Sequence, residues 1–305
     1  MLKPKRLLKG DTVAVISPCF ATPAERLPDI LKAIENLGLK ARLGKYVTSV
    51  TEGYCASPYE RAEDFNDAVR DKNVKMILFD GGEVCNEILP LIDYAAIAEN
   101  PKIICSYSDG TSLLDPITTK TGLVTYYGQG TLSTLYSQYN RECFKSAFFD
   151  GGVPAYKTAK GFKKIYGGKA SGRLIGGYLL NFSLLCGNPY FTFDGNIDHI
   201  LFFEDNIAFN GAPAVSRYIS NIEQSGLWKS VKGIIVGNYS NTENKEFDSL
   251  LNRFANKWRL PFIKCDDFGH GEFQAILPIG IECEINADRG TVEFKESFTK
   301  QAVLS

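Results

Sequence analysis

Short apolar runs alternate with amphipathic stretches through the first half of the chain, and this alternation constrains the fold more than any other feature. The runs "TVAVIS", "VKMILFDGG" and "KIICSYSD" have the length of strands, and segments such as "PAERLPDILKAIENLGL" and "RAEDFNDAVRD" have helical periodicity. Strands that are separated by helices are joined by right-handed crossovers, which produce a parallel sheet covered on both faces. The pattern therefore predicts an α/β fold with a parallel sheet in the N-terminal half.

Polar segments follow three of the predicted strands, at residues 17–19, 80–83 and 106–110. In a parallel sheet the carboxyl ends of the strands share one edge, and the ligand crevice lies at that edge. We therefore expect these three segments to gather at one rim of the sheet.

A change in composition divides the chain. Residues 149–172 are rich in glycine, lysine and small residues without strong periodicity, which is typical of an interdomain connection. Beyond it, "HILFFED" and "VKGIIVGNYS" are strand-like, and "IGIECEINAD" and "TVEFKE" are joined by Arg-Gly like a hairpin. We expect an N-terminal α/β domain over residues 1–150, a linker over 151–170 and a mixed α/β domain over 171–305.

Charge and hydropathy exclude several classes of partner. The 34 basic residues nearly balance the 35 acidic ones, so no overall field favours nucleic acid or an anionic membrane surface. No run of about 18 apolar residues occurs, and the N-terminus lacks an apolar stretch followed by a small-residue cleavage site. We therefore expect a cytoplasmic protein that binds a small ligand, with no nucleic-acid or membrane partner.

The eight cysteines are spread along the chain without a C-x-x-C pair. Disulfide frameworks and structural metal sites use closely spaced cysteines. The spacing therefore predicts reduced core thiols, with no disulfide and no metal site.

The segment "PKIICSYSDGTSLL" passes from a predicted strand through a serine into a predicted helix. A tight strand-to-helix turn lifts a serine hydroxyl out of the backbone and points helix-start amides at its target, so Ser108 is a candidate nucleophile. The alternative is that Ser108 only caps the helix. A nucleophilic serine needs a base, and histidine is the usual one. Of the two histidines, His199 enters a predicted strand and fits a packing role, whereas His270 lies between two glycines in a loop and is the candidate base.

A catalytic histidine also needs an acid that orients it, and "ILFFED" supplies two carboxylates. Four consecutive apolar residues predict a strand buried on both faces, so Glu204 and Asp205 at its end would emerge at the sheet rim. From this motif alone, carboxylates that are simply solvated are favoured. An oxyanion hole needs two main-chain donors, and the candidates are Asp109 and the diglycine of Gly81 and Gly82.

Taken in order, several segments resemble one family of serine peptidases. They are "DGGEVCNEILPLIDY", "PKIICSYSDGTSLL", "GRLIGGYLLNFSLLCGNPY", "ILFFED", "VKGIIVGNYS" and "FGHGEFQAILPIG". In this order they resemble the LD-carboxypeptidases and the microcin C immunity proteins over nearly the whole chain, from "LKGDTVAVISP" onward. The resemblance implies Ser108 as the nucleophile, Glu204 as the orienting acid and His270 as the general base, with oxyanion amides from Asp109, Gly81 and Gly82. It further implies a flavodoxin-like parallel sheet in the N-terminal domain, a smaller mixed α/β C-terminal domain, a homodimer, and no metal or organic cofactor.

Departures from the family pattern leave the triad intact and the substrate open. Ser106 replaces a glycine, "EVC" lacks the usual Tyr-Gly, and Tyr178 replaces an asparagine. The favoured hypothesis is cleavage of the L,D-peptide bond that holds the terminal D-alanine of a muropeptide, a step of peptidoglycan recycling. The alternatives are hydrolysis of an aminoacyl nucleotide such as processed microcin C, and a binding protein of the same fold that has lost turnover. Trp228 fits a packing role and offers no evident platform for adenine, which favours the peptide.

Overall fold

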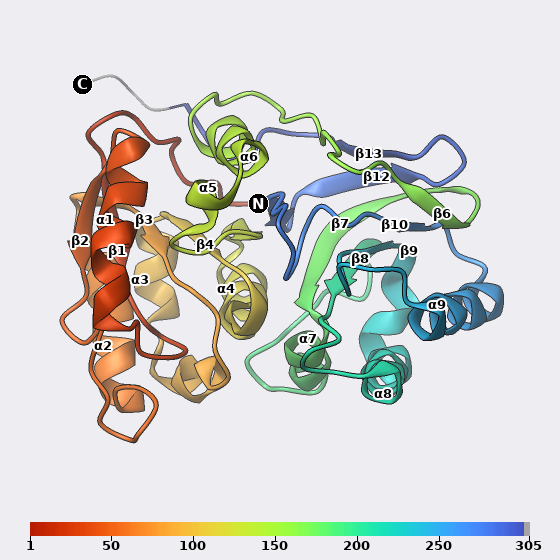
Figure 1. Cartoon of the computed structure of the whole chain (residues 1–305), viewed down its shortest axis with the longest axis horizontal. Coiled ribbons are helices and arrows are strands. Elements are labelled where there is room, and N and C mark those ends of the chain that lie inside the picture. The colour runs from red at the N-terminus through yellow and green to blue at the C-terminus, as the bar shows by residue number, and fades with distance from the viewer. Residues whose placement is uncertain (302–305) are drawn as a thin grey trace.

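The fold is α/β, with two sheets that lie side by side in a computed structural model describing residues 1–301 (Figure 1). The first sheet has six strands in the order β11-β5-β4-β3-β1-β2. Its strands are β1 (Thr12–Val15), β2 (Lys40–Leu43), β3 (Val74–Leu78), β4 (Ile103–Ser106), β5 (Thr125–Tyr127) and β11 (Leu277–Ile279). Strands β1 to β5 pair in parallel and β11 is antiparallel to β5, so the predicted parallel sheet is confirmed for the N-terminal half.

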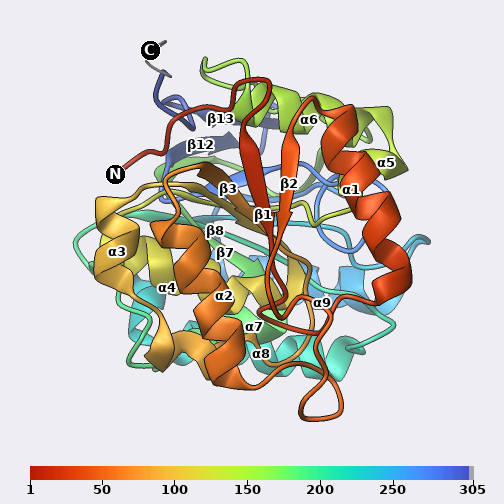
Figure 2. The same cartoon turned by 90° about the vertical axis from the view of Figure 1, so that its left-hand side faces the viewer.

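Helices cover this first sheet on both faces, as the crossover argument predicts. They are α1 (Leu27–Asn36), α2 (Pro58–Arg70), α3 (Tyr94–Glu99), α4 (Thr111–Thr121), α5 (Ser133–Tyr136) and α6 (Gln138–Phe148), with 3-10 turns η1 (Ala24–Arg26), η2 (Cys85–Leu91) and η3 (Ser108–Gly110). In Figure 2, α1 lies on one side of the strands and α2 and α3 lie on the other. Helix α2 begins at a capping box in which Ser57 and Glu60 satisfy each other's main-chain N–H groups.

The second sheet has seven strands in the order β13-β12-β7-β8-β9-β10-β6. Its strands are β6 (Lys163–Tyr166), β7 (Lys169–Tyr178), β8 (His199–Glu204), β9 (Val231–Val236), β10 (Phe262–Lys264), β12 (Glu282–Asn286) and β13 (Thr291–Phe294). The accompanying helices are α7 (Leu179–Leu185), α8 (Ala212–Gln224), α9 (Lys245–Trp258) and the 3-10 turn η4 (Gly226–Ser230). Strands β7 to β10 are parallel, and the predicted hairpin of β12 and β13 is present.

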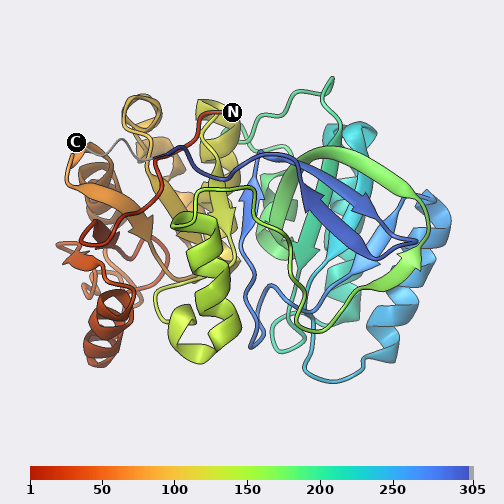
Figure 3. The ribbon, with the colours of Figure 1, turned by 90° about the horizontal axis from the view of Figure 1, so that it is seen from above.

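Two short strands differ from the sequence expectation. Strand β6 lies inside the expected linker of residues 151–170, where its main chain pairs with β10 at the edge of the second sheet. Strand β11 comes from the C-terminal half but completes the first sheet beside β5. Main-chain hydrogen bonds hold both strands in their sheets. Each strand is only three or four residues long, which is too short for its sequence to show a periodic apolar pattern. Seen from above, the segment after α6 runs across from the first half of the molecule to the second (Figure 3).

The strand "HILFFE" is buried at every position, which confirms the prediction of a strand covered on both faces. None of the helices within residues 1–301 combines the length and the apolar character that a membrane crossing requires.

Candidate active site

Ser108 occupies a strained turn between β4 and α4. Tyr107 is still extended, whereas Ser108 has a φ of 56°, one of two positive values among non-glycine residues within residues 1–301. A side chain in this left-handed region costs free energy unless the surroundings hold it there. The turn is therefore the predicted strand-to-helix elbow, and Ser108 is not inside a regular helix.

His270 connects Ser108 to Glu204 in one hydrogen-bonded chain. The Nε2 atom of His270 lies 2.9 Å from the Ser108 Oγ atom, and its Nδ1 atom lies 2.9 Å from the Glu204 Oε2 atom. Glu204, rather than Asp205, stands beside the imidazole. In the neutral histidine, Nδ1–H donates to Glu204 and Nε2 accepts from the serine hydroxyl, which is the arrangement of a base poised to take the serine proton.

The Glu204 carboxylate controls the protonation of His270. Burial alone would lower the pKa of His270, but the charge and hydrogen bond of Glu204, with a further contribution from the charge of Asp205, raise it above its ordinary value. Glu204 itself is fully buried. The site thus stabilises an imidazolium, the species that forms when histidine accepts a proton from serine.

Tyr127 links the acid to the nucleophile, and sequence reasoning missed it. Its hydroxyl donates to Glu204 Oε1 and accepts from the main-chain N–H of Ser108 at 3.1 Å. The side chain is fully buried, and burial together with the Glu204 charge raises the pKa of Tyr127 far above its usual range. Tyr127 therefore stays a neutral donor and fixes the second carboxylate oxygen of Glu204.

The departure at Ser106 is accommodated by a glycine. A Cβ atom placed at Gly110 would lie 2.3 Å from the Ser106 Oγ atom, so the serine side chain fills space that only a glycine leaves open. The elbow therefore holds an extra side chain without losing the turn at Ser108.

Of the predicted oxyanion residues, Gly81 and Asp109 lie next to Ser108, and Gly82 lies against Cys19. A Cβ atom at Gly81 would lie 2.6 Å from the Ser108 Cβ atom, and one at Gly82 would lie 2.7 Å from the Cys19 Cβ atom, so both positions require glycine. Within residues 1–301, the main-chain N–H groups of Gly81 and Gly82 donate to no acceptor. The Asp109 carboxylate accepts from the Cys85 N–H at 2.8 Å and ties this loop to the elbow. The three predicted segments thus meet at one rim.

Asp205 is buried, so the expectation that it is simply solvated is wrong. It is 1% exposed, and burial raises the pKa of Asp205 to about 7. Asn210 donates to the Asp205 Oδ1 atom at 3.0 Å and to the Tyr178 hydroxyl at 2.9 Å. Burial follows from the position of the carboxylate between packed loops at the end of β8, which the apolar run alone does not reveal.

Three aromatic rings surround the imidazole of His270. The ring centroids of Tyr178, Phe209 and Tyr107 lie 5.0, 5.5 and 5.6 Å from that of His270. Phe209 is 67% exposed, so an aromatic side chain beside His270 is open to solvent.

His199 and Trp228 lie outside this group and pack as expected. His199 is buried in β8, where its Nδ1 atom lies 3.0 Å from the Ser230 Oγ atom. The rings of Trp228 and Trp258 pack against each other in the second half of the chain, with their centroids 4.5 Å apart and their planes tilted by 47°.

Cys19, Cys85 and Asp109 come together beside Gly82, although they are far apart in the sequence. One ligand atom of each lies within 4.8 Å of the others, so the group could offer a metal two sulfur atoms and one oxygen atom. Burial raises the pKa of both thiols, and the Asp109 carboxylate already accepts two hydrogen bonds shorter than 3 Å, from Cys85 and Asn181. We assign the group to packing, and all eight cysteines are free thiols.

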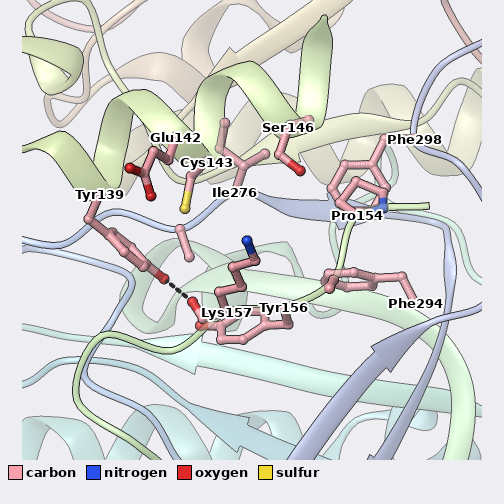
Figure 4. A pocket seen from close by; sticks show the side chains of 13 residues that line it. Tyr139, Glu142, Cys143, Ser146, Pro154, Tyr156, Lys157, Ile276, Phe294 and Phe298 are labelled. Carbon is pink, nitrogen blue, oxygen red and sulfur yellow. Dashed lines mark hydrogen bonds between the residues drawn. The ribbon is translucent and has the colours of Figure 1, made fainter. Parts of the chain in front are cut away.

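A separate apolar cavity of about 90 Å³ lies beneath α6 (Figure 4). Its lining includes Tyr139, Cys143, Tyr156, Ile276 and Phe294, and none of the predicted site residues. The Tyr139 hydroxyl donates to the Lys157 carbonyl at 2.8 Å across it.

Family models match both halves of the chain. The LD-carboxypeptidase N-terminal domain matches residues 13–128, and the LD-carboxypeptidase C-terminal domain matches residues 171–285. The chain belongs to the LD-carboxypeptidase family.

Relatives in the LD-carboxypeptidase family match over almost their whole length. A Treponema pallidum protein named "Putative carboxypeptidase" is 30% identical, covering 94% of this chain and 93% of the relative. A Bacillus subtilis protein named "Probable murein peptide carboxypeptidase" is 29% identical and covers 99% and 97%. The solved microcin C7 self-immunity protein, in a variant bound to adenosine monophosphate, is 25% identical with a TM-score of 0.85, covering 98% of this chain and 100% of that structure. The family supports a serine hydrolase of the carboxypeptidase class.

Proposed function

We propose that Ser108, His270 and Glu204 are the catalytic triad of a serine carboxypeptidase. The observation that carries the proposal is the hydrogen-bonded chain with two distances of 2.9 Å on either side of the His270 ring. In the acylation step the Ser108 Oγ atom attacks an amide carbonyl while its proton passes to His270 Nε2, and Glu204 stabilises the imidazolium. His270 then gives the proton to the leaving amine. Water, activated by the same imidazole, hydrolyses the acyl-enzyme and restores Ser108.

The main-chain N–H groups of Gly81, Gly82 and Asp109 would bind the oxyanion of each tetrahedral intermediate. This role is supported by the closeness of Gly81 to Ser108, where an added Cβ atom would lie 2.6 Å from the Ser108 Cβ atom, and by the unoccupied donors of the diglycine. Fixed donors that point at developing charge are the largest single source of rate enhancement in acyl transfer.

The proposed substrate is a muropeptide whose terminal D-alanine is attached through an L,D-peptide bond. The Bacillus subtilis relative, which carries the name of a murein peptide carboxypeptidase and matches 99% of this chain, supports this choice. The corresponding role is peptidoglycan recycling in the cytoplasm by a homodimer. Light scattering of the purified protein tests the dimer.

Phe209 favours a second candidate, hydrolysis of an aminoacyl nucleotide. Its ring is 67% exposed beside His270, and an exposed aromatic face can stack on a purine base. The similarity to the microcin C7 self-immunity protein, solved with adenosine monophosphate, supports the same candidate. The acyl-transfer chemistry at Ser108 would be the same, and only the leaving group would differ.

Mass spectrometry of products decides between these substrates. Purified protein is incubated separately with a muropeptide tetrapeptide and with an aminoacyl sulfamoyl adenosine, and Ser108→Ala serves as the control. Release of D-alanine by the wild type alone supports the proposal, and release of the amino acid from the adenosine supports the second candidate. If neither compound is cleaved while both bind, the chain is a binding protein of this fold.

A further inference from the structure

A basic cavity lies at the edge of the first sheet opposite the candidate active site. Residues 80–82 and 107–108 follow β3 and β4, whereas this cavity is formed by residues that precede or begin the same two strands and by both ends of the described chain. Its volume is about 290 Å³. The lining comprises six lysines and three further residues: Lys3, Lys5, Lys72, Lys75, Lys102 and Lys300, with Val74, Asn100 and Pro101.

No carboxylate is among the described residues that line this basic cavity. Two acidic residues lie close by: Glu296 pairs with the Lys3 Nζ atom at 2.6 Å and so balances one of the six lysines, and Asp71, whose charge acts on Lys102, pairs with Arg42 at 2.8 Å. The Lys75 Nζ atom donates to the main-chain carbonyl of Lys72 at 2.8 Å. The chain as a whole has a net charge of −1, so this concentration of positive charge is local.

Lys102 is the buried member of the basic cavity. It is 6% exposed, and its Nζ atom donates to the main-chain carbonyls of Asp71 at 2.7 Å and Val74 at 2.6 Å. Burial, together with the charge of nearby Lys75, lowers the pKa of Lys102 to about 8. A buried ammonium beside like charges costs free energy, and an anion in the cavity would offset that cost.

We propose that the basic cavity binds a small, multiply charged phosphate compound, of which inorganic tripolyphosphate is the test probe. Lysine ammonium groups bind phosphate oxygens as point charges without a fixed direction, which suits a cluster of them around one anion. The lining contains no aromatic side chain on which a nucleic-acid base could stack, which favours a compact anion over a single strand. The site is independent of the proposed hydrolase function, because it lies at the opposite edge of the sheet.

Isothermal titration calorimetry tests the basic cavity with tripolyphosphate at low ionic strength. The double variant Lys72→Gln/Lys75→Gln removes two exposed charges from the lining, and Lys229→Gln/Lys245→Gln removes two exposed charges in the second half of the chain. We expect the first variant to lose about tenfold in affinity and the control to change less than about twofold. The proposal is overturned if the wild type does not bind tripolyphosphate, or if both variants lose affinity equally.

The Lys102 side chain gives a second measurement that does not depend on a variant. An NMR titration of its CεH₂ group should show a pKa that rises when tripolyphosphate is added, because the anion stabilises the ammonium form. Binding that leaves the Lys102 pKa unchanged would place the anion elsewhere and overturn the assignment. Inorganic phosphate and vesicles with anionic headgroups, added in separate titrations, distinguish a free polyphosphate from a lipid source.

Discussion

Replacing Tyr127 with phenylalanine should damage both stability and turnover, because one hydroxyl serves both Glu204 and the main chain of Ser108. The substitution removes a hydrogen bond to a buried carboxylate, and such bonds contribute about 1.5–3 kcal/mol. It also leaves the Ser108 N–H without its acceptor, and a buried unsatisfied donor costs about 1–3 kcal/mol. We expect the free energy of unfolding to fall by about 2–4 kcal/mol. This is less than the sum of the two losses, because both arise at the same hydroxyl and the surrounding groups relax together.

The catalytic effect of Tyr127→Phe follows from the same contacts. A loosened Glu204 and elbow should lower kcat by about 10- to 100-fold, which corresponds to about 1.4–2.7 kcal/mol of transition-state stabilisation. Urea unfolding followed by tryptophan fluorescence measures the first quantity, and mass-spectrometric turnover of the best substrate measures the second.

Tyr126 supplies the matched control for Tyr127. It is also fully buried, but its hydroxyl donates at 2.7 Å to the Phe298 carbonyl, away from the site. Tyr126→Phe should lose about 1 kcal/mol of stability while kcat stays unchanged. The reasoning is refuted if Tyr127→Phe keeps wild-type stability and kcat, or if the two variants behave alike.

Three further predictions use the same turnover assay. Ser108→Ala and His270→Ala should each lower kcat by about 10³-fold or more, and the double variant should lose little more, because neither group works without the other. Near-wild-type turnover by Ser108→Ala would rule out the serine mechanism. Asp205→Asn should move the acid limb of the pH profile of kcat/KM to lower pH, because the Asp205 charge helps to raise the pKa of His270 and the histidine must be neutral to act as a base. An acid limb that stays at the wild-type pH contradicts this prediction. Gly110→Ala should unfold at a lower temperature than the wild type, because the new Cβ atom would lie 2.3 Å from the Ser106 Oγ atom. Adding Ser106→Gly should restore part of the lost unfolding temperature, and a double variant no more stable than Gly110→Ala contradicts the packing argument.

The sequence was sufficient to predict the elements whose signal is local. The parallel N-terminal sheet, the buried strand before Glu204 and the C-terminal hairpin each have a periodicity or an apolar run of their own. The gathering of residues 17–19, 80–83 and 106–110 at one rim follows from parallel topology alone, since every such strand ends at the same edge.

Contacts that depend on packing between distant segments were not predictable. Tyr127 stands beside Tyr126 in a three-residue strand, and nothing local says which phenol reaches Glu204, 77 residues away. Asp205 follows Glu204 directly, and its burial depends on the loop that carries Asn210, which the sequence around Asp205 does not place there. Strands β6 and β11 were not predictable either, because strand pairing holds them and neither has a sequence pattern of its own. The linker boundaries at 150 and 170 stay a prediction.

The elbow and the acid belong to different sheets, and a glycine allows them to meet. The Thr111 hydroxyl donates to the Ser108 carbonyl at 2.8 Å and accepts from the Tyr178 N–H at 2.9 Å, so the first turn of α4 is bonded directly to the end of β7. A Cβ atom at Gly177 would lie 2.3 Å from the Thr111 Oγ1 atom and would force α4 away. Because β7 pairs with β8, that displacement would separate Ser108 from His270 and Glu204 together. Gly177 is therefore required by the packing of the two sheets, and any contact that the neighbouring Tyr178 makes with substrate is a separate property.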